Sequence, residues 1–107
     1  MSLATLEDYS RRQLSCPITL VTGTGQAFFT KTIDVSKHGA LVAFPFEDAP
    51  AVGEVLDIQL LLPTSVRGQA TRTINGQARV VRHQDLGQDG KTGIGLQFLP
   101  PLRLATA

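Results

Sequence analysis

The sequence predicts an all-β domain, a six-stranded antiparallel β-barrel with little or no helix, and three observations lead to this prediction. Leucine or isoleucine occupies every second position from Leu56 to Leu62, which is the period of a strand with one face against a core. Short segments rich in β-branched and aromatic residues recur along the chain. Turn signals separate them, and no helical segment is available to connect parallel strands, so an antiparallel sandwich or barrel is favoured.

Six strands follow from these segments. They are expected at Ile18 to Thr22, Ala27 to Val35, Ala40 to Phe44, Leu56 to Leu62, Gln77 to His83 and Thr92 to Leu99. The turns between them are expected at Gly23 to Gln26, Lys37 to Gly39, Pro50 to Gly53, Pro63 to Gly68 and Gly87 to Gly90. The dipeptide Asn75-Gly76 is typical either of a tight hairpin or of a bulge inside one long bent strand, and we favour the bulge.

Length and composition indicate how many domains the chain forms and where it is located. The 107 residues predict one domain over 1–107 with a core at about 11–99 and frayed ends at Met1 to Asp8 and Leu102 to Ala107. The hydrophobic content of 42 % excludes a disordered chain. Cys16 is the single cysteine and predicts a small buried side chain, not a disulfide. With no export signal and no apolar run that could span a bilayer, a cytoplasmic location is expected.

Charge argues against binding of a nucleic-acid polymer, because a net charge of +1 is too small to neutralise many phosphates. The stretch from Ile58 to Gln84 nevertheless contains no acidic residue and holds four arginines, namely Arg67, Arg72, Arg79 and Arg82. Two interpretations remain open. These arginines are solvated side chains on outer strand faces, or they form a local anion site.

The most informative motif is D-x-S-x-x-G, formed by Asp34, Ser36 and Gly39 between two expected strands. With its surroundings it resembles the PilZ family. The family's other marks are matched by the segments Pro17 to Leu20, Val52 to Ile58 and Gly93 to Phe98, the last with the spacing G-x-G-x-x-F. This resemblance implies a PilZ-type β-barrel in which the D-x-S-x-x-G turn and an upstream R-x-x-x-R segment clamp the bacterial second messenger cyclic di-GMP.

Each residue of this turn suits that ligand. An ionised Asp34 can accept two N–H bonds from a guanine edge, Ser36 can donate or accept beside it, and Gly39 can adopt positive φ and let the ligand approach the backbone. The alternative is an Asx or Ser/Thr turn, in which Asp34 and Ser36 bond nearby backbone N–H groups and shape the strand connection.

The upstream segment departs from the family pattern. Arg11 and Arg12 are adjacent, whereas the family pattern has two arginines four apart to grip phosphates and stack on purines. In one register Asp8 stands at the first position, and in the other Ser15 stands at the second. One arginine of the family pattern is missing in either register. This predicts that cyclic di-GMP binds roughly ten- to a hundredfold more weakly than it would with both arginines in place.

Catalysis is not expected. Asp34, Ser36 and His38 include the residue types of a hydrolytic triad, but residues two apart on one strand face lie about 7 Å apart, against about 3 Å in a working Ser–His pair. His38 and His83 lack further ligands at metal spacing, so neither a metal nor a cofactor is expected. All five phenylalanines are core candidates, with Phe46 the most exposed of them.

Two functions are therefore carried forward. In the first, the domain is a receptor in which Arg11, Arg12, Asp34, Ser36 and Gly39 bind cyclic di-GMP, and the N-terminal segment orders over the ligand. The signal would pass to motility, secretion or exopolysaccharide machinery. In the second, a PilZ-like adaptor has lost the nucleotide and acts through protein contacts.

Overall fold

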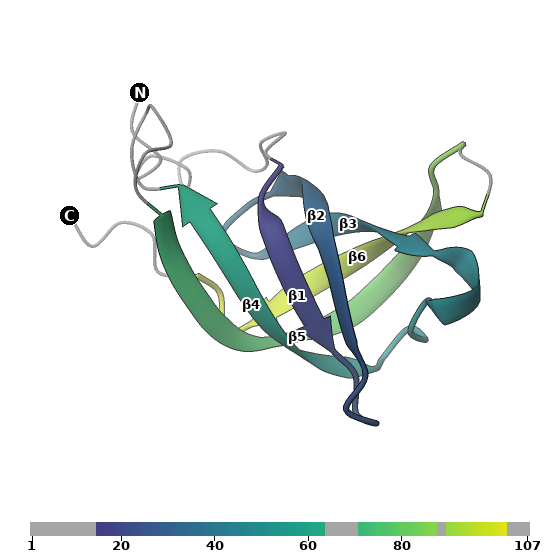
Figure 1. Cartoon of the computed structure of the whole chain (residues 1–107), viewed down its shortest axis with the longest axis horizontal. Helices are drawn as coiled ribbons and strands as arrows, with labels where there is room; N and C mark the ends of the chain where they lie inside the picture. Colours follow the sequence, from purple (N-terminus) through teal and green to yellow (C-terminus); the bar gives the residue numbers. More distant parts are fainter. Residues whose placement is uncertain (1–14, 64–70, 88–89, 103–107) are drawn as a thin grey trace.

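The computed structural model describes residues 15–63, 71–87 and 90–102, apart from the side chain of Phe46. The residues in these ranges form six strands, which close into an antiparallel barrel in the order β1-β2-β3-β6-β5-β4 (Figure 1). The elements are β1 (Pro17–Val21), β2 (Ala27–Val35), β3 (Gly39–Pro45), a 3₁₀ turn η2 (Phe46–Asp48), β4 (Val55–Pro63), β5 (Thr71–Asp85) and β6 (Lys91–Leu99). The predicted fold class is confirmed, and each expected strand overlaps an observed one.

Strand β5 passes straight through Asn75-Gly76. Asn75 pairs with Gln59 and Gly76 with Ile58 in an unbroken register against β4. The prediction of one long strand is confirmed. Neither the hairpin nor the bulge expected at this dipeptide is present, so both of those predictions were wrong. Gly76 is exposed although it pairs with the buried Ile58, and a Cβ there would meet nothing within 4 Å, so the missing side chain leaves space and does not break the strand.

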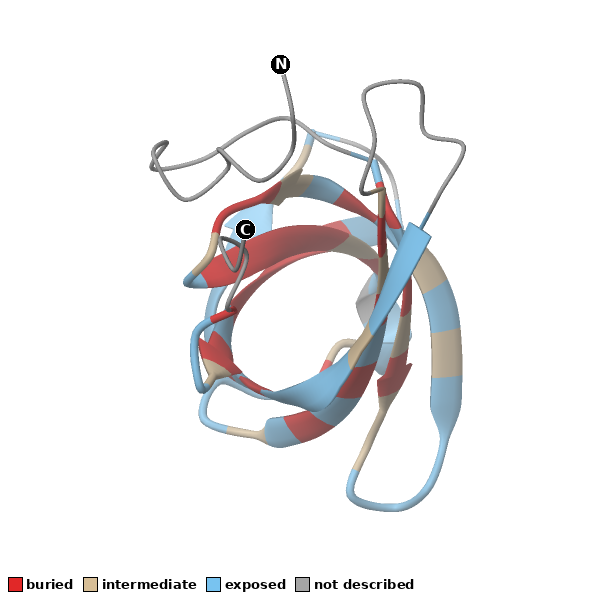
Figure 2. Ribbon diagram, turned by 90° about the vertical axis from the view of Figure 1, so that its left-hand side faces the viewer, coloured by how far each residue is buried: buried red, intermediate tan, exposed pale blue. Residues whose placement is uncertain are grey.

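The inner face of the barrel holds a single apolar core to which every strand contributes (Figure 2). Phe44 of β3 and Phe98 of β6 are its largest fully buried side chains, and the Phe28 ring lies 4.7 Å from the Phe44 ring. Phe29 is 81 % exposed, so its assignment to the core was wrong. Adjacent residues of a strand point to opposite faces, and Phe28 already occupies the inner face.

Two β-bulges interrupt this alternation, one in β2 and one in β5. In β2, Thr32 pairs with Val42 and Asp34 with Leu41, which leaves Ile33 as an extra residue. In β5, the register shifts in the same way between Val80 and Arg82. A bulge of one residue reverses the face on which every later side chain lies.

The end of the barrel near the start of β1 also holds the β2–β3 turn and the segment that follows β6 (Figure 1). Leu102 is buried against the core, and its N–H donates to the Lys37 carbonyl oxygen at 2.7 Å. The chain therefore packs on the barrel as far as Leu102, which was expected in a frayed end. Among the residues described, the structure contains no helix that could cross a membrane.

Candidate ligand site at the Asp34 turn

The bulge at Ile33 decides where Asp34 points. Without the extra residue, Asp34 would follow Thr32 onto the inner face and Val35 would face outward. In the structure Val35 is fully buried in the core, while Asp34 is half-buried on the outer face opposite Leu41. The Asp34 side chain therefore lies on the outer face of the barrel next to the turn.

Ser36 organises the turn that follows. Its hydroxyl oxygen accepts hydrogen bonds from the backbone N–H groups of His38 at 3.2 Å and Gly39 at 3.3 Å, and the Ser36 N–H donates to the Gly39 carbonyl at 2.8 Å. The side chain is 2 % exposed. These bonds are those of the Ser/Thr turn that was the alternative interpretation of the motif.

Replacing Ser36 by alanine is expected to lower the free energy of unfolding by about 1–2 kcal/mol, because two N–H groups of a buried turn lose their acceptor. Urea unfolding of the purified domain measures this. Ser15→Ala, which removes the hydroxyl of an exposed serine, is the matched control and is expected to change stability by less than about 0.5 kcal/mol. Equal stabilities of the two variants would contradict this account of the turn.

Gly39 is required for a reason that the sequence did not show. Positive φ occurs at Gly25, Gly53, Gly87 and Gly90 but not at Gly39, so that expectation was wrong. A Cβ on Gly39 would collide with the Leu96 carbonyl oxygen of the neighbouring strand β6. Glycine at the last position of the motif thus allows two backbones to lie close together.

The segment from β6 onward holds the turn from its other side. The Phe98 N–H donates to the His38 carbonyl at 2.8 Å, and the Leu102 N–H donates to the Lys37 carbonyl at 2.7 Å. Both carbonyl groups at the tip of the turn therefore accept hydrogen bonds from β6 or from the residues directly after it. The turn is fixed by Ser36 within and by this segment outside, so Asp34 is presented from a rigid support.

Not every predicted site residue can be placed. The structure brings Asp34, Ser36 and Gly39 together in one turn, whereas Arg11 and Arg12 lie outside the described residues. Arg67 of the acid-free stretch does as well. Their roles stay predictions from the sequence.

The other reactive side chains of the described part are structural. Cys16 is fully buried, and desolvation by burial raises the pKa of its thiol, although a hydrogen bond with Thr32 opposes this. A ring nitrogen of His83 lies 2.7 Å from the Pro50 carbonyl oxygen, as expected of a histidine at the edge of the core. Residues 15–63, 71–87 and 90–102 contain no group of three or more His, Cys, Asp and Glu side chains that could hold a metal.

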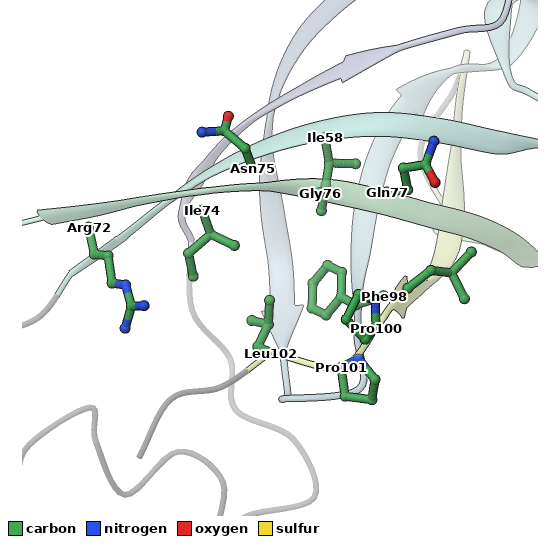
Figure 3. Close-up of a pocket in the computed structure, with 11 residues that line it drawn as sticks. Ile58, Arg72, Ile74, Asn75, Gly76, Gln77, Phe98, Pro100, Pro101 and Leu102 are labelled. Atoms are coloured by element: carbon green, nitrogen blue, oxygen red, sulfur yellow. The ribbon is translucent and has the colours of Figure 1, made fainter. Parts of the chain in front are cut away.

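A separate cavity of about 130 Å³ lies at the same end of the barrel (Figure 3). Ile58, Phe98 and Leu102 line it together with Pro100 and Pro101, and the empty position at Gly76 opens it. Its walls are mainly apolar. Arg72, Asn75 and Gln77 also line it, but the side chains of Asn75 and Gln77 lie on the outer face, where they form hydrogen bonds with Gln59 and Asp57 (Figure 3). A space of this size and character does not suit a nucleotide.

The comparisons with known proteins agree with this fold. Residues 6–106 match the PilZ domain family. The fold is similar to the structure of the Bacillus subtilis inhibitor of motility (MotI/DgrA), with a TM-score of 0.72 and 20 % identity over 86 % of this chain and 42 % of that one. It is also similar to the PilZ domain of CeSA from a cellulose-synthesizing bacterium, with a TM-score of 0.57 and 20 % identity over 83 % of this chain and 80 % of that one.

No curated protein matches the sequence significantly. The chain spans less than half the length of the B. subtilis inhibitor of motility, so its likeness to that protein concerns the fold. The family is one of receptor and effector domains, and no family of enzymes is indicated. Since the family match extends over most of the sequence, the chain belongs to the PilZ domain family.

Proposed function

We propose that this domain is a receptor for cyclic di-GMP that passes the signal to a partner protein by changing the surface around the Asp34 turn. The observation that carries the proposal is the position of Asp34. The Ile33 bulge turns its carboxylate outward beside a rigid D-x-S-x-x-G turn in a chain of the PilZ family, whose members are generally receptors for this nucleotide.

In this function Asp34 accepts N–H bonds from a guanine edge, and Ser36 and Gly39 hold the turn in the geometry that the base requires. Arg11 and Arg12 are assigned the phosphates and purine faces on sequence grounds. The partner belongs to motility, secretion or exopolysaccharide machinery. This class is suggested by the two similar structures, one an inhibitor of motility and the other from a cellulose-synthesizing bacterium.

Calorimetric titration with cyclic di-GMP, with GTP as the control nucleotide, tests the proposal. Saturable binding is expected, and Asp34→Ala is expected to weaken it by roughly ten- to a hundredfold because hydrogen bonds to a charged group are lost. Arg12→Ala is expected to abolish binding with little change in melting temperature. Asp57→Ala removes an exposed acid from β4 and should bind like the wild type.

The outcomes separate the two functions carried forward from the sequence. Binding that is weakened in the Asp34 variant, lost in the Arg12 variant and kept in the Asp57 variant supports the receptor. A wild-type domain that stays silent at ligand concentrations far above the micromolar range would refute it and leave the adaptor, whose partner would then be sought by pull-down without nucleotide.

A further inference from the structure

Arg82 is turned to the outer face of the barrel by the second bulge. Val80 pairs with Leu96 and both are buried in the core, whereas Arg82 pairs with Gly95, so Val81 is the extra residue. An unbroken alternation would have pointed the Arg82 side chain into the apolar interior. Bulges often lie beside functional sites, where they redirect one side chain, and this one redirects a cation.

The side chain of Arg82 lies across Gly95 on the neighbouring strand β6. A Cβ built on Gly95 would be 2.7 Å from Arg82 Cγ and 3.2 Å from Arg82 Cζ, so the stem and the guanidinium cover the place of the missing side chain. Within the described residues the guanidinium makes no hydrogen bond or ion pair. The cation is thus held on the barrel surface with its donors available.

Arg82 lies in the same row of paired residues as Asp34 of the candidate site. Gly95 pairs with Leu41 of β3, and Leu41 pairs with Asp34 of β2. The bulges turn the side chains of Asp34 and Arg82 outward. These two residues therefore lie at opposite ends of one row of cross-strand neighbours. The guanidinium, resting on β6, is about two strand spacings from the strand of Asp34, roughly 10 Å along the surface.

A second row runs beside the first. Gly39 of the turn pairs with Gln97 of β6, and Gln97 pairs with Arg79 of β5. Gln97 and Arg79 are exposed on the outer face. The outer face between the turn and β5 thus carries Leu41 and Gly95 next to Asp34, and two arginines at its far side.

We propose that Arg82, laid across Gly95, binds a phosphate of the cyclic dinucleotide whose guanine is held at Asp34. The inference rests on the receptor function proposed above and adds a residue outside both family motifs. A guanidinium fork can bind a phosphate bidentately, and a dinucleotide with two bases and two phosphates is long enough to reach from the turn to β6. Arg82 thereby supplies the phosphate anchor that the adjacent pair Arg11 and Arg12 lacks.

The test is titration of the wild type, Arg82→Gln, Arg82→Lys and Arg72→Ala with cyclic di-GMP at two salt concentrations. Arg82→Gln is expected to weaken binding by roughly ten- to a hundredfold and to reduce its dependence on salt, because a charge-assisted contact is lost. Arg82→Lys, which keeps the charge, should retain more affinity than Arg82→Gln. Arg72 is the control, since it is an exposed arginine of β5 that pairs with Leu62 of β4 and lies outside the two rows that join Asp34 and Gly39 to β5.

Melting curves of all variants establish that the barrel is folded. Arg82→Gln binding as tightly as the wild type, or Arg72→Ala losing as much affinity as Arg82→Gln, would overturn the role of Arg82 and leave the receptor function standing. Absence of binding by the wild type would instead overturn the receptor function, and the inference with it. The two failures are therefore distinguishable in one experiment.

Discussion

Phe44→Ala is expected to lower the free energy of unfolding by about 3–5 kcal/mol, the range for removing a fully buried aromatic side chain. Phe44 is a member of the core and is 1 % exposed, and its ring lies 4.7 Å from that of Phe28. The loss combines the transfer free energy of the ring with the cavity it leaves between the strands. Urea unfolding followed by circular dichroism measures the change as a shift of the midpoint at constant slope.

Phe29→Ala provides the matched control for this substitution. It removes the same side chain from the outer face of β2, where it is almost fully exposed, so a change within about 0.5 kcal/mol is expected. A large loss in the Phe29 variant, or a small one in the Phe44 variant, would mean that β2 and β3 present other faces to the core than those described.

Gly39→Ala is expected to lower the stability by about 3 kcal/mol, at the upper end of the cost of overpacking. The added Cβ meets the Leu96 carbonyl oxygen, and because this atom belongs to the backbone of β6, no rotamer change can relieve the collision. The β3–β6 pairing must separate locally. For a domain of this size the melting temperature should fall by roughly 10–20 °C, which differential scanning calorimetry would record.

Gly23→Ala tests whether the effect at Gly39 is specific. A Cβ at Gly23 would meet nothing within 4 Å, and Gly23 is not among the glycines with positive φ. Its replacement should leave the melting temperature within about 2 °C of the wild type, or raise it slightly by restricting the unfolded chain. Similar losses in both variants would show that the close approach to Leu96 is not what requires glycine at position 39.

The strands were predictable because their signal is local. Alternation from Leu56 to Leu62 and the turn residues between segments are properties of short windows, and these located all six strands of the barrel. The two bulges are different. They appear only as shifts in pairing between distant strands, so no window around Ile33 or Val81 reveals them.

The same distinction applies to the candidate site. The D-x-S-x-x-G motif located the turn, and the bonds of Ser36 agree with the alternative stated from its residue type. The requirement for Gly39 arises from Leu96, far away in the sequence, whereas positive φ, one of the two reasons expected for this glycine, is not observed. Arg82 was noted only as part of a basic stretch, because its proximity to the turn depends on β6 lying between β3 and β5.

The order of strands around the barrel constrains how the chain can fold. β1 finds its second neighbour in β4, and β3 finds its own only in β6, the last strand. An emerging chain that contains the first three strands therefore lacks a partner for each outer one, and its loop-closure entropy is repaid only when distant segments meet. Folding of this barrel is a cooperative event of nearly the whole strand set, with the D-x-S-x-x-G turn locked only when β6 arrives.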